Sequence, residues 1–477
     1  MQTNTIRSFR NTKIVASLGP ASDSERTLAG MLRAGMNVAR FNFSHGTHEE
    51  HGDRMTRLRE VSAKVKIPVA LLQDLGGPKI RIGDFTTPTV KLVRGKRFVI
   101  TTDRIEGTVE RVSINYKKLP REVGPGASIL LNDGKVHVRV THTTATDIVC
   151  TVVIGGTIRG RRGVNVPGAM LSISAITPKD KKDLIFGLSQ GVHFVTLSFV
   201  RTAQEVHKLR SLLGEHKDRV GIVAKIETRE AVENLDAIIA AADAVMVARG
   251  DLAVEIPREE VPLVQKKIIR ACNAAGKPVI TATQMLDSMR ENEAPTRAEV
   301  NDVANAIFDG SDAVMLSDET TIGLHPEAAV RTLDAIARAV EREGGEYRTR
   351  TPETWHEDAI APSIALSVAR KARELNTHAV VALTETGTTA RLIARHRIEQ
   401  PILVLTPREA TFHQTLLVYG CMPVLVAPIT SFSDALKESR AQLKRLRFAG
   451  KSDRFVLGAG MPFRQSGTTN MLIVEKV

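Results

Sequence analysis

The stretch Ile222-Val223-Ala224-Lys225-Ile226-Glu227 is a short apolar run that ends in a cation and a carboxylate. Its length and composition predict a buried strand, and side chains two residues apart on a strand share a face, so Lys225 and Glu227 point the same way. The next such run, residues 244–248, is followed by Gly250 and Asp251. A cation and two carboxylates at neighbouring strand ends predict a site for a divalent metal and a phosphorylated ligand.

Eight runs of this kind occur along the chain, and most of them are followed by a helical pattern. They cover residues 13–18, 37–43, 69–74, 194–200, 222–226, 244–248, 278–283 and 313–317. Apolar strands that alternate with amphipathic helices are typical of a parallel sheet covered by helices. Eight units predict a (β/α)8 TIM barrel, whose chemistry lies at the carboxyl ends of its strands. A doubly wound sheet also alternates, but Ser17-Leu18-Gly19-Pro20 is not the Gly-rich loop that more often follows its first strand.

The pattern changes at two places along the chain. Between residues 77 and 177 it consists of short β runs and turns, with a hairpin signal at Asn132-Asp133-Gly134. Helix-start residues at Thr177-Pro178-Lys179-Asp180 mark the return of the barrel, and strands and helices alternate again after a linker at 341–357. The predicted domains are a barrel (1–76 and 177–345), an inserted all-β lid that forms a small β-barrel (77–176), and a C-terminal open α/β regulatory domain (355–477). The alternative to a mobile, water-excluding lid is a decorative insertion.

Composition narrows the class of protein. The 477 residues are 42% hydrophobic and 25% charged, as in an ordinary globular protein. The net charge of +13 fits nucleic acid or anionic small molecules, but aromatic residues make up only 4%, which is poor for base stacking. No apolar run approaches the ~20 residues of a membrane span, and the polar N-terminus lacks a signal-peptide core. Three widely spaced cysteines favour a reducing, cytoplasmic setting. We therefore expect no membrane and no nucleic-acid partner.

Ordered motifs along nearly the whole chain resemble the pyruvate kinase family. They are Thr12-Lys13-Ile14-Val15, residues 37–46, Gly77-Pro78-Lys79-Ile80-Arg81, Ala224-Lys225-Ile226-Glu227, residues 247–252, Thr281-Ala282-Thr283-Gln284-Met285-Leu286, Pro295-Thr296-Arg297-Ala298-Glu299 and residues 312–317. The resemblance implies a homotetramer that transfers the phosphoryl group of phosphoenolpyruvate to ADP, giving pyruvate and ATP, in the last step of glycolysis.

The resemblance also implies roles for the residues at the strand ends. The catalytic residues would be Lys225, Thr283 and Ser317, and the substrate would be bound by Arg40, Lys225, Gly250, Asp251 and Thr283. Glu227 and Asp251 would hold Mg²⁺ or Mn²⁺. Taken singly, Lys225 and Glu227 have an alternative interpretation as a structural ion pair. The alternative for the Thr283 and Ser317 hydroxyls is that they are buried groups whose hydrogen bonds are satisfied. A metal-dependent lyase on a related barrel is a second reading, but it would need no ADP site.

The nucleotide and potassium positions follow from the same resemblance. Asn42, His45, Arg81 and Arg162 would contact ADP, with Arg162 at a place where the family commonly has Lys. Many members bind K⁺ at positions that correspond to Asn42, Ser44, Asp74 and Leu75. Leu75 brings no side-chain oxygen, and Lys79 stands at a place where those members have Glu. The chain thus resembles the potassium-independent branch, and K⁺ is predicted not to be required.

A Thr-rich segment opens a helix in the last domain. Hydroxyls and free amides at a helix start can cradle a phosphate. The effector residues would be Thr384, Thr386, Gly387, Thr388 and Thr389, with Ser466, Gly467 and Thr468 on a loop that closes over them. The predicted ligand is a phosphorylated allosteric effector, a sugar phosphate or nucleoside monophosphate. A plain Thr-rich cap and turn is the alternative.

Overall fold

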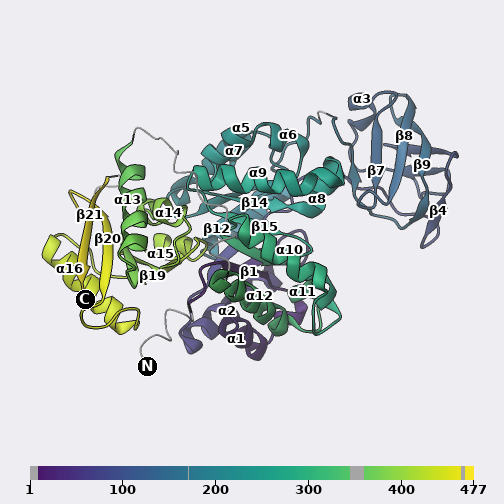
Figure 1. The fold of residues 1–477 in the computed structure, drawn as a ribbon. Helices are drawn as coiled ribbons and strands as arrows, with labels where there is room; N and C mark the ends of the chain where they lie inside the picture. The colour runs from purple at the N-terminus through teal and green to yellow at the C-terminus, as the bar shows by residue number, and fades with distance from the viewer. Residues whose placement is uncertain (1–8, 170, 344–358, 464–467) are drawn as a thin grey trace.

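The computed structural model describes residues 9–169, 171–343, 359–463 and 468–477. Three bodies are visible in Figure 1: a central barrel wrapped by helices, a β-rich body attached to it on the side of α8 (Arg249–Glu255), and a C-terminal α/β body on the opposite side. Among the described residues, no helix combines the length and the apolar character needed to cross a membrane.

Eight parallel strands close into a barrel, in the order β1-β16-β15-β14-β13-β12-β3-β2. They are β1 (Lys13–Ser17), β2 (Val38–Asn42), β3 (Ala70–Asp74), β12 (Phe194–Leu197), β13 (Gly221–Ile226), β14 (Ala244–Ala248), β15 (Val279–Ala282) and β16 (Ala313–Leu316). The predicted TIM barrel is therefore confirmed, and every strand overlaps its predicted run. All residues of β1, β3 and β14 are buried, because helices cover the barrel outside and side chains fill its interior.

Helices fill the connections between the strands. They are η2 (Pro20–Ser22), α1 (Glu25–Arg33), α2 (His48–Val65), α4 (Pro178–Ser189), α5 (Ala203–Leu212), η3 (Gly214–His216), α6 (Arg229–Glu233), α7 (Leu235–Ala241), α8 (Arg249–Glu255), η4 (Arg258–Glu260), α9 (Val261–Ala274), η5 (Asp287–Arg290), α10 (Arg297–Phe308), α11 (Asp318–Thr321) and α12 (Pro326–Glu343). Helix α4 begins as predicted, since the Thr177 hydroxyl accepts from the Asp180 amide and the Asp180 carboxylate accepts from the Thr177 amide.

The inserted body between β3 and α4 consists of two sheets. The larger has the order β11-β7-β8-β9-β5-β6, and β10 pairs with β4. Its elements are β4 (Val90–Leu92), β5 (Arg97–Thr101), β6 (Arg111–Ser113), α3 (Leu119–Glu122), β7 (Ser128–Leu131), β8 (Val136–Thr143), β9 (Asp147–Ile154), β10 (Gly156–Ile158) and β11 (Val164–Asn165). The predicted hairpin is confirmed: β7 pairs antiparallel with β8, and Asn132, Asp133 and Gly134 all have positive φ. The described strands form a six-stranded sheet and a separate pair, and the small β-barrel expected for this insertion remains a prediction.

The C-terminal body is one open sheet with the order β19-β18-β17-β20-β21, in which only β21 runs antiparallel to its neighbour. Its elements are α13 (Ile360–Glu374), β17 (Ala379–Leu383), α14 (Thr388–Ala394), β18 (Ile402–Thr406), α15 (Glu409–Thr415), β19 (Cys421–Leu425), α16 (Phe432–Arg445), β20 (Arg454–Gly460) and β21 (Thr469–Lys476). Helix α16 was not predicted. Most of the predicted linker, residues 344–357, lies outside the described residues.

The C-terminal body contacts the amino ends of the barrel strands. Lys13, the first residue of β1, donates to the Cys421 carbonyl oxygen at 2.7 Å, and Asp312, just before β16, pairs with Arg397 at 2.7 Å. His193, just before β12, stacks on His413 of α15 with ring centroids 3.8 Å apart. This end of the barrel is therefore covered, and the carboxyl ends of the strands face the inserted body.

Candidate active site at the carboxyl ends of the barrel strands

Lys225 is a buried cation held between two carboxylates. Its ammonium lies 2.8 Å from a Glu227 oxygen and 3.6 Å from an Asp74 oxygen, and it donates to the Ser198 hydroxyl at 3.0 Å. Burial acts to lower the pKa of Lys225, but the Asp74 and Glu227 carboxylates outweigh it, and the pKa is raised above its ordinary value. Lys225 is therefore a fixed positive charge at the barrel rim.

Glu227 and Asp251 supply the carboxylates expected of a divalent metal site. Glu227 is 1% exposed and accepts from the Phe199 amide at 2.6 Å. Burial, with a further contribution from the Asp251 carboxylate at the start of α8, raises the pKa of Glu227 to about 7 against the pull of Lys225. Two carboxylates with hard oxygen donors fit Mg²⁺ or Mn²⁺, because a divalent cation would stabilise the charged form of the buried Glu227.

Arg40 is anchored on Asp74 at the neighbouring strand ends. Its Nε donates to an Asp74 oxygen at 2.7 Å and its Nη1 to the Ser17 hydroxyl at 2.7 Å. Burial would raise the pKa of Asp74, but the Lys225 and Arg40 cations, together with a hydrogen bond from the Thr196 hydroxyl, lower it well below its ordinary value. An ionised Asp74 thus holds both basic side chains at the rim.

Three hydroxyl residues of this network were missed in the sequence: Ser17, Thr196 and Ser198. Thr196 belongs to β12 and Ser198 follows that strand, two positions further on. Two polar residues at alternate positions, at the end of an otherwise apolar strand, share one face of it. That alternation is a signal that could have pointed to both of them.

Thr283 and Gly250 meet in a strained turn after β15. The Thr283 hydroxyl accepts from the Gly250 amide at 2.9 Å and donates to the Ala282 carbonyl oxygen at 2.6 Å. The φ angles of Thr283 and Gln284 are +68° and +54°, a conformation that costs about 1–3 kcal/mol for each such residue and clusters at functional sites. The turn brings together two residues that were assigned to substrate binding.

Ser317 follows β16, the strand beside β15, as predicted. Its amide donates to a Glu319 oxygen at 2.7 Å. Within the described ranges, no hydrogen bond joins the Ser317 hydroxyl to Thr283, and the catalytic role of Ser317 remains a prediction.

A cleft lies between the barrel and the inserted body. One cavity in it is lined on the barrel side by Asp251 and on the other side by Arg162, and Lys79 and Arg81 contribute to it as well. A neighbouring cavity shares Lys79 and Arg81. The two bodies touch where the Asn165 amide group donates to the Glu255 carboxylate at 2.8 Å. A basic cleft of this kind can take up an anionic nucleotide.

The loop after β2 carries the other residues assigned to the nucleotide. Asn42 and His45 line neither cavity, but Ser44 lines the second. Burial, and then the Lys79 and Arg81 cations, lower the pKa of His45, so its ring lies near the cleft in a neutral form. Arg81 and Arg162 therefore line the cleft itself, whereas Asn42 and His45 belong to a loop at its border.

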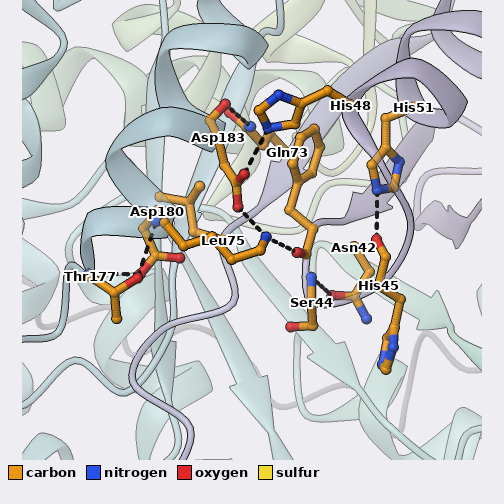
Figure 2. A network of polar contacts seen from close by, with 12 residues as sticks. Asn42, Ser44, His45, His48, His51, Gln73, Leu75, Thr177, Asp180 and Asp183 are labelled. Atoms are coloured by element: carbon orange, nitrogen blue, oxygen red, sulfur yellow. Dashed lines mark hydrogen bonds and ion pairs between the residues drawn. The ribbon is translucent and has the colours of Figure 1, made fainter.

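Figure 2 shows how that loop is fastened to its neighbours. The Ser44 amide donates to the Asn42 side chain at 3.1 Å, and His51 is hydrogen-bonded to the His45 carbonyl oxygen at 2.9 Å. Lys179 of α4 donates to the carbonyl oxygen of Phe43 at 2.7 Å and to the Asp183 carboxylate at 2.6 Å. The first turn of α4 thus ties the end of the inserted body to this loop.

Two of the side chains at the positions where many family members bind K⁺ are poorly suited to hold a cation. Leu75 is 1% exposed and apolar, and Asp74 is already bonded to Arg40 and Thr196. Burial and the Lys225 cation lower the pKa of Lys79, while Asp251, Glu227 and Asp74 oppose this. Among the described residues, no carboxylate lies within ion-pair distance of the Lys79 ammonium, which therefore adds an unpaired positive charge near the acids.

The Thr-rich segment of the C-terminal body lines a cavity of about 560 Å³. Its lining includes Thr384, Thr386, Thr388, Thr389 and Thr468. Gly387, with φ +78°, precedes α14, and its amide donates to the Thr384 hydroxyl at 2.9 Å. Ser466 and Gly467, also predicted for this site, lie outside the described residues.

Together these features define a class of protein: a TIM-barrel enzyme with a lid-like insertion, whose basic cleft and acid pair suit a phosphorylated, anionic substrate. Two family models match the chain, "Pyruvate kinase, barrel domain" over residues 9–330 and "Pyruvate kinase, alpha/beta domain" over residues 362–475. The chain belongs to the pyruvate kinase family and is a phosphotransferase.

Curated relatives agree with this assignment. Proteins named pyruvate kinase from Staphylococcus aureus strains MRSA252, USA300 and NCTC 8325 are each 42% identical to this chain over 477 residues, which covers 98% of the chain and 81% of each relative. The resemblance seen in the motifs is therefore confirmed over nearly the full length.

Proposed function

We propose that this enzyme transfers the phosphoryl group of phosphoenolpyruvate to ADP at the barrel rim, giving pyruvate and ATP in the last step of glycolysis. The observation that carries the proposal is the Lys225 ammonium, fixed between Glu227 and Asp74 at the barrel rim. Phosphoryl transfer needs positioning and charge neutralisation more than covalent catalysis. A permanently charged ammonium at the transferring group supplies both.

The substrate is held by groups on neighbouring strand ends. The Gly250 and Asp251 amides and the Thr283 hydroxyl bind its carboxylate, once Gly250 and Thr283 exchange the hydrogen bonds that they make within the turn for bonds to the substrate. Arg40 and Lys225 bind its phosphate. Lys225 also stabilises the enolate oxygen that forms when the phosphoryl group leaves, because a fixed cation there favours the developing negative charge. Thr283 and Ser317 then help to deliver a proton to the enolate.

Glu227 and Asp251 would hold Mg²⁺ or Mn²⁺ beside this substrate. When bound, the ion supplies positive charge to the phosphoryl and enolate oxygens. Arg81 and Arg162 bind the ADP phosphates across the cleft, and Asn42 and His45 border the nucleotide. The inserted body acts as a lid, because closing it over the cleft would exclude water from the transferring group.

A coupled assay with phosphoenolpyruvate and ADP tests the proposal directly. We expect pyruvate to form with Mg²⁺ or Mn²⁺, and the rate to vanish when the metal is chelated with EDTA and return when it is added back. Consumption of phosphoenolpyruvate without ATP formation would point to a lyase or phosphatase instead. No turnover of phosphoenolpyruvate under any of these conditions would overturn the assignment of the site.

We also propose that the enzyme needs no K⁺, with the Lys79 ammonium supplying the positive charge. Leu75 offers no ligand oxygen, and Lys79 lies near Asp74, Glu227 and Asp251, whose negative charges act on its pKa. A point cation on a protein side chain can replace a bound monovalent ion where only its charge is needed.

The C-terminal cavity is proposed to bind a phosphorylated effector, a sugar phosphate or a nucleoside monophosphate. Its hydroxyl-rich lining offers several hydrogen-bond donors to a phosphate. By family likeness we further propose a homotetramer. Three free, buried cysteines support a reducing, cytoplasmic location.

A further inference from the structure

Arg249 lies outside the cleft but holds the strained turn that carries Thr283. It is the first residue of α8, directly before Gly250, and its side chain is 13% exposed. Its Nη2 donates to the Thr283 carbonyl oxygen at 2.6 Å, and its Nε to the Ala282 carbonyl oxygen at 3.1 Å. One guanidinium therefore holds the last two peptide groups of this turn before Gln284.

The other side of the guanidinium is anchored on the surrounding helices. Its Nη1 lies 2.7 Å from an Asp302 oxygen of α10 and 3.5 Å from the Gln265 side chain of α9, and its Nη2 also lies 2.9 Å from the Met285 sulfur. Arg249 thus joins two helices of the barrel wall to the end of β15, and each of its three nitrogens has a partner.

The turn needs such a restraint because its backbone is unfavourable. Thr283 is β-branched and Gln284 also bears a Cβ, yet both have positive φ. Strained backbone persists only where the surrounding structure over-determines it. The amide of Gly250, the residue after Arg249, donates to the Thr283 hydroxyl at 2.9 Å. Arg249 and Gly250 together therefore fix both the peptide and the side chain of Thr283.

We infer that Arg249 is a positioning residue for phosphoenolpyruvate, acting through Thr283. This rests on the proposed binding of the substrate carboxylate by Thr283 and Gly250. A planar fork with several donors can bridge two carbonyl oxygens and a carboxylate at once, whereas an ammonium on a flexible stem cannot. Arg249→Lys keeps the charge but releases the turn, so the Thr283 hydroxyl loses its fixed place.

The test uses oxalate, a small dicarboxylate that resembles the enolate of pyruvate, together with steady-state kinetics. Arg249→Lys is expected to weaken oxalate inhibition and raise the KM for phosphoenolpyruvate by about 10- to 100-fold, because a shift near 1 Å at a binding group has effects of that order. The KM for ADP should stay within about twofold. An equal loss for both substrates would indicate general damage and overturn the inference.

Arg210→Lys is the matched control. Its guanidinium donates to the Ala241 carbonyl oxygen at 3.0 Å and to Asp243 at 2.9 Å, at the opposite end of β14. It therefore reproduces the same kind of contacts away from the turn, and its oxalate inhibition should match the wild type. If Arg249→Lys does not fold, Asp302→Asn removes a single anchor of the guanidinium and should give a smaller change in the same direction.

A double variant separates this inference from the assignment of Thr283. Thr283→Ala should itself weaken oxalate inhibition, and adding Arg249→Lys to it should cost little more, since Arg249 acts through Thr283. Fully additive effects, or a silent Arg249→Lys beside a damaging Thr283→Ala, would overturn the positioning role alone. A silent Thr283→Ala would overturn the proposed carboxylate site and this inference with it.

Discussion

The charge of Lys225 is set by its neighbours rather than by its exposure. An isolated buried lysine tends to lose its proton, but Asp74 and Glu227 keep this one charged. Asp74 also holds Arg40, and both acids influence the pKa of Lys79, so the basic groups at the rim share one acidic cluster. Removing a member of this network therefore changes both the charge at the reacting group and the placement of its partners.

Lys225→Ala should lower kcat by about 10³-fold or more, as expected for a cation that neutralises charge in phosphoryl transfer. Lys267→Ala, on an exposed position of α9, is the control and should be silent. The coupled assay measures both. A loss of less than tenfold for Lys225→Ala would contradict its proposed role.

The K⁺ requirement of the enzyme is also predicted from a single side chain, that of Lys79. Turnover in a tetramethylammonium buffer should stay within about twofold of that in KCl, because Lys79 already supplies the charge. Lys79→Met removes that charge, and its rate in tetramethylammonium should fall and partly recover with KCl. The idea is wrong if the wild-type enzyme without K⁺ retains only a few per cent of its rate.

At the scale of elements, the start of α14 combines a hydroxyl cluster with a buried cation. The Thr386 and Thr388 hydroxyls lie 3.0 Å apart, and Arg391, one turn along the helix, donates to Thr388 at 3.1 Å and to the Thr386 carbonyl oxygen at 3.0 Å. Burial lowers the pKa of Arg391. This cation lies behind the loop that was assigned to a phosphorylated effector.

Thr388→Glu should abolish activation by a hexose phosphate or AMP while sparing the basal rate. The new carboxylate repels an incoming phosphate and pairs with Arg391, while the barrel rim is left untouched. Ser367→Glu, on the exposed side of α13 in the same body, adds the same charge as a control and should keep the response. Activation that survives in Thr388→Glu would exclude this cavity as the effector site.

At the scale of the whole molecule, the barrel uses its two ends differently. The carboxyl end opens into the cleft, and the amino end is covered by the C-terminal body through Lys13, His193 and Asp312. Lys13 is 3% exposed, near Arg10, Asp312 and Glu341. A substitution at this buried contact between the barrel and the C-terminal body is therefore expected to change the stability of the protein.

Burial lowers the pKa of Lys13 from 10.5 to about 8. The free energy of unfolding of the protein therefore depends on pH in this range. Between those values the unfolded chain binds the proton more tightly than the folded one, so stability rises with pH across the window. The free energy of unfolding of the wild type, relative to Lys13→Met, should therefore increase from pH 8 to 10, by up to about 1.4 kcal/mol per pH unit.

Denaturant unfolding at each pH, followed by circular dichroism, measures this difference. Other titrating groups cancel in the comparison, because both proteins carry them. Lys13→Met also leaves the Cys421 carbonyl oxygen without its donor, but that cost is the same at every pH. A difference that is flat or falls between pH 8 and 10 would contradict the buried, depressed lysine.

Much of the fold could be predicted because the barrel strands are buried on both faces. Each therefore appears as a mainly apolar run, which is visible without any knowledge of its neighbours. Helix α16 was missed because few of its own residues are apolar, and the pairing of the short strands in the inserted body could not be read from the sequence because it depends on contacts between separate segments. Patterns along the chain identify elements more readily than the partners of those elements.

The barrel, the order of the domains and the polar residues at the strand ends could be predicted from the amino-acid sequence, since periodicity and composition act locally. The folded chain was needed to show that Asp74 contacts both Arg40 and Lys225, that Ser198 joins them, and that Arg249 holds a strained turn. These partners come from different strands and helices. Their distances are set by the closing of the barrel, which no single stretch of sequence encodes.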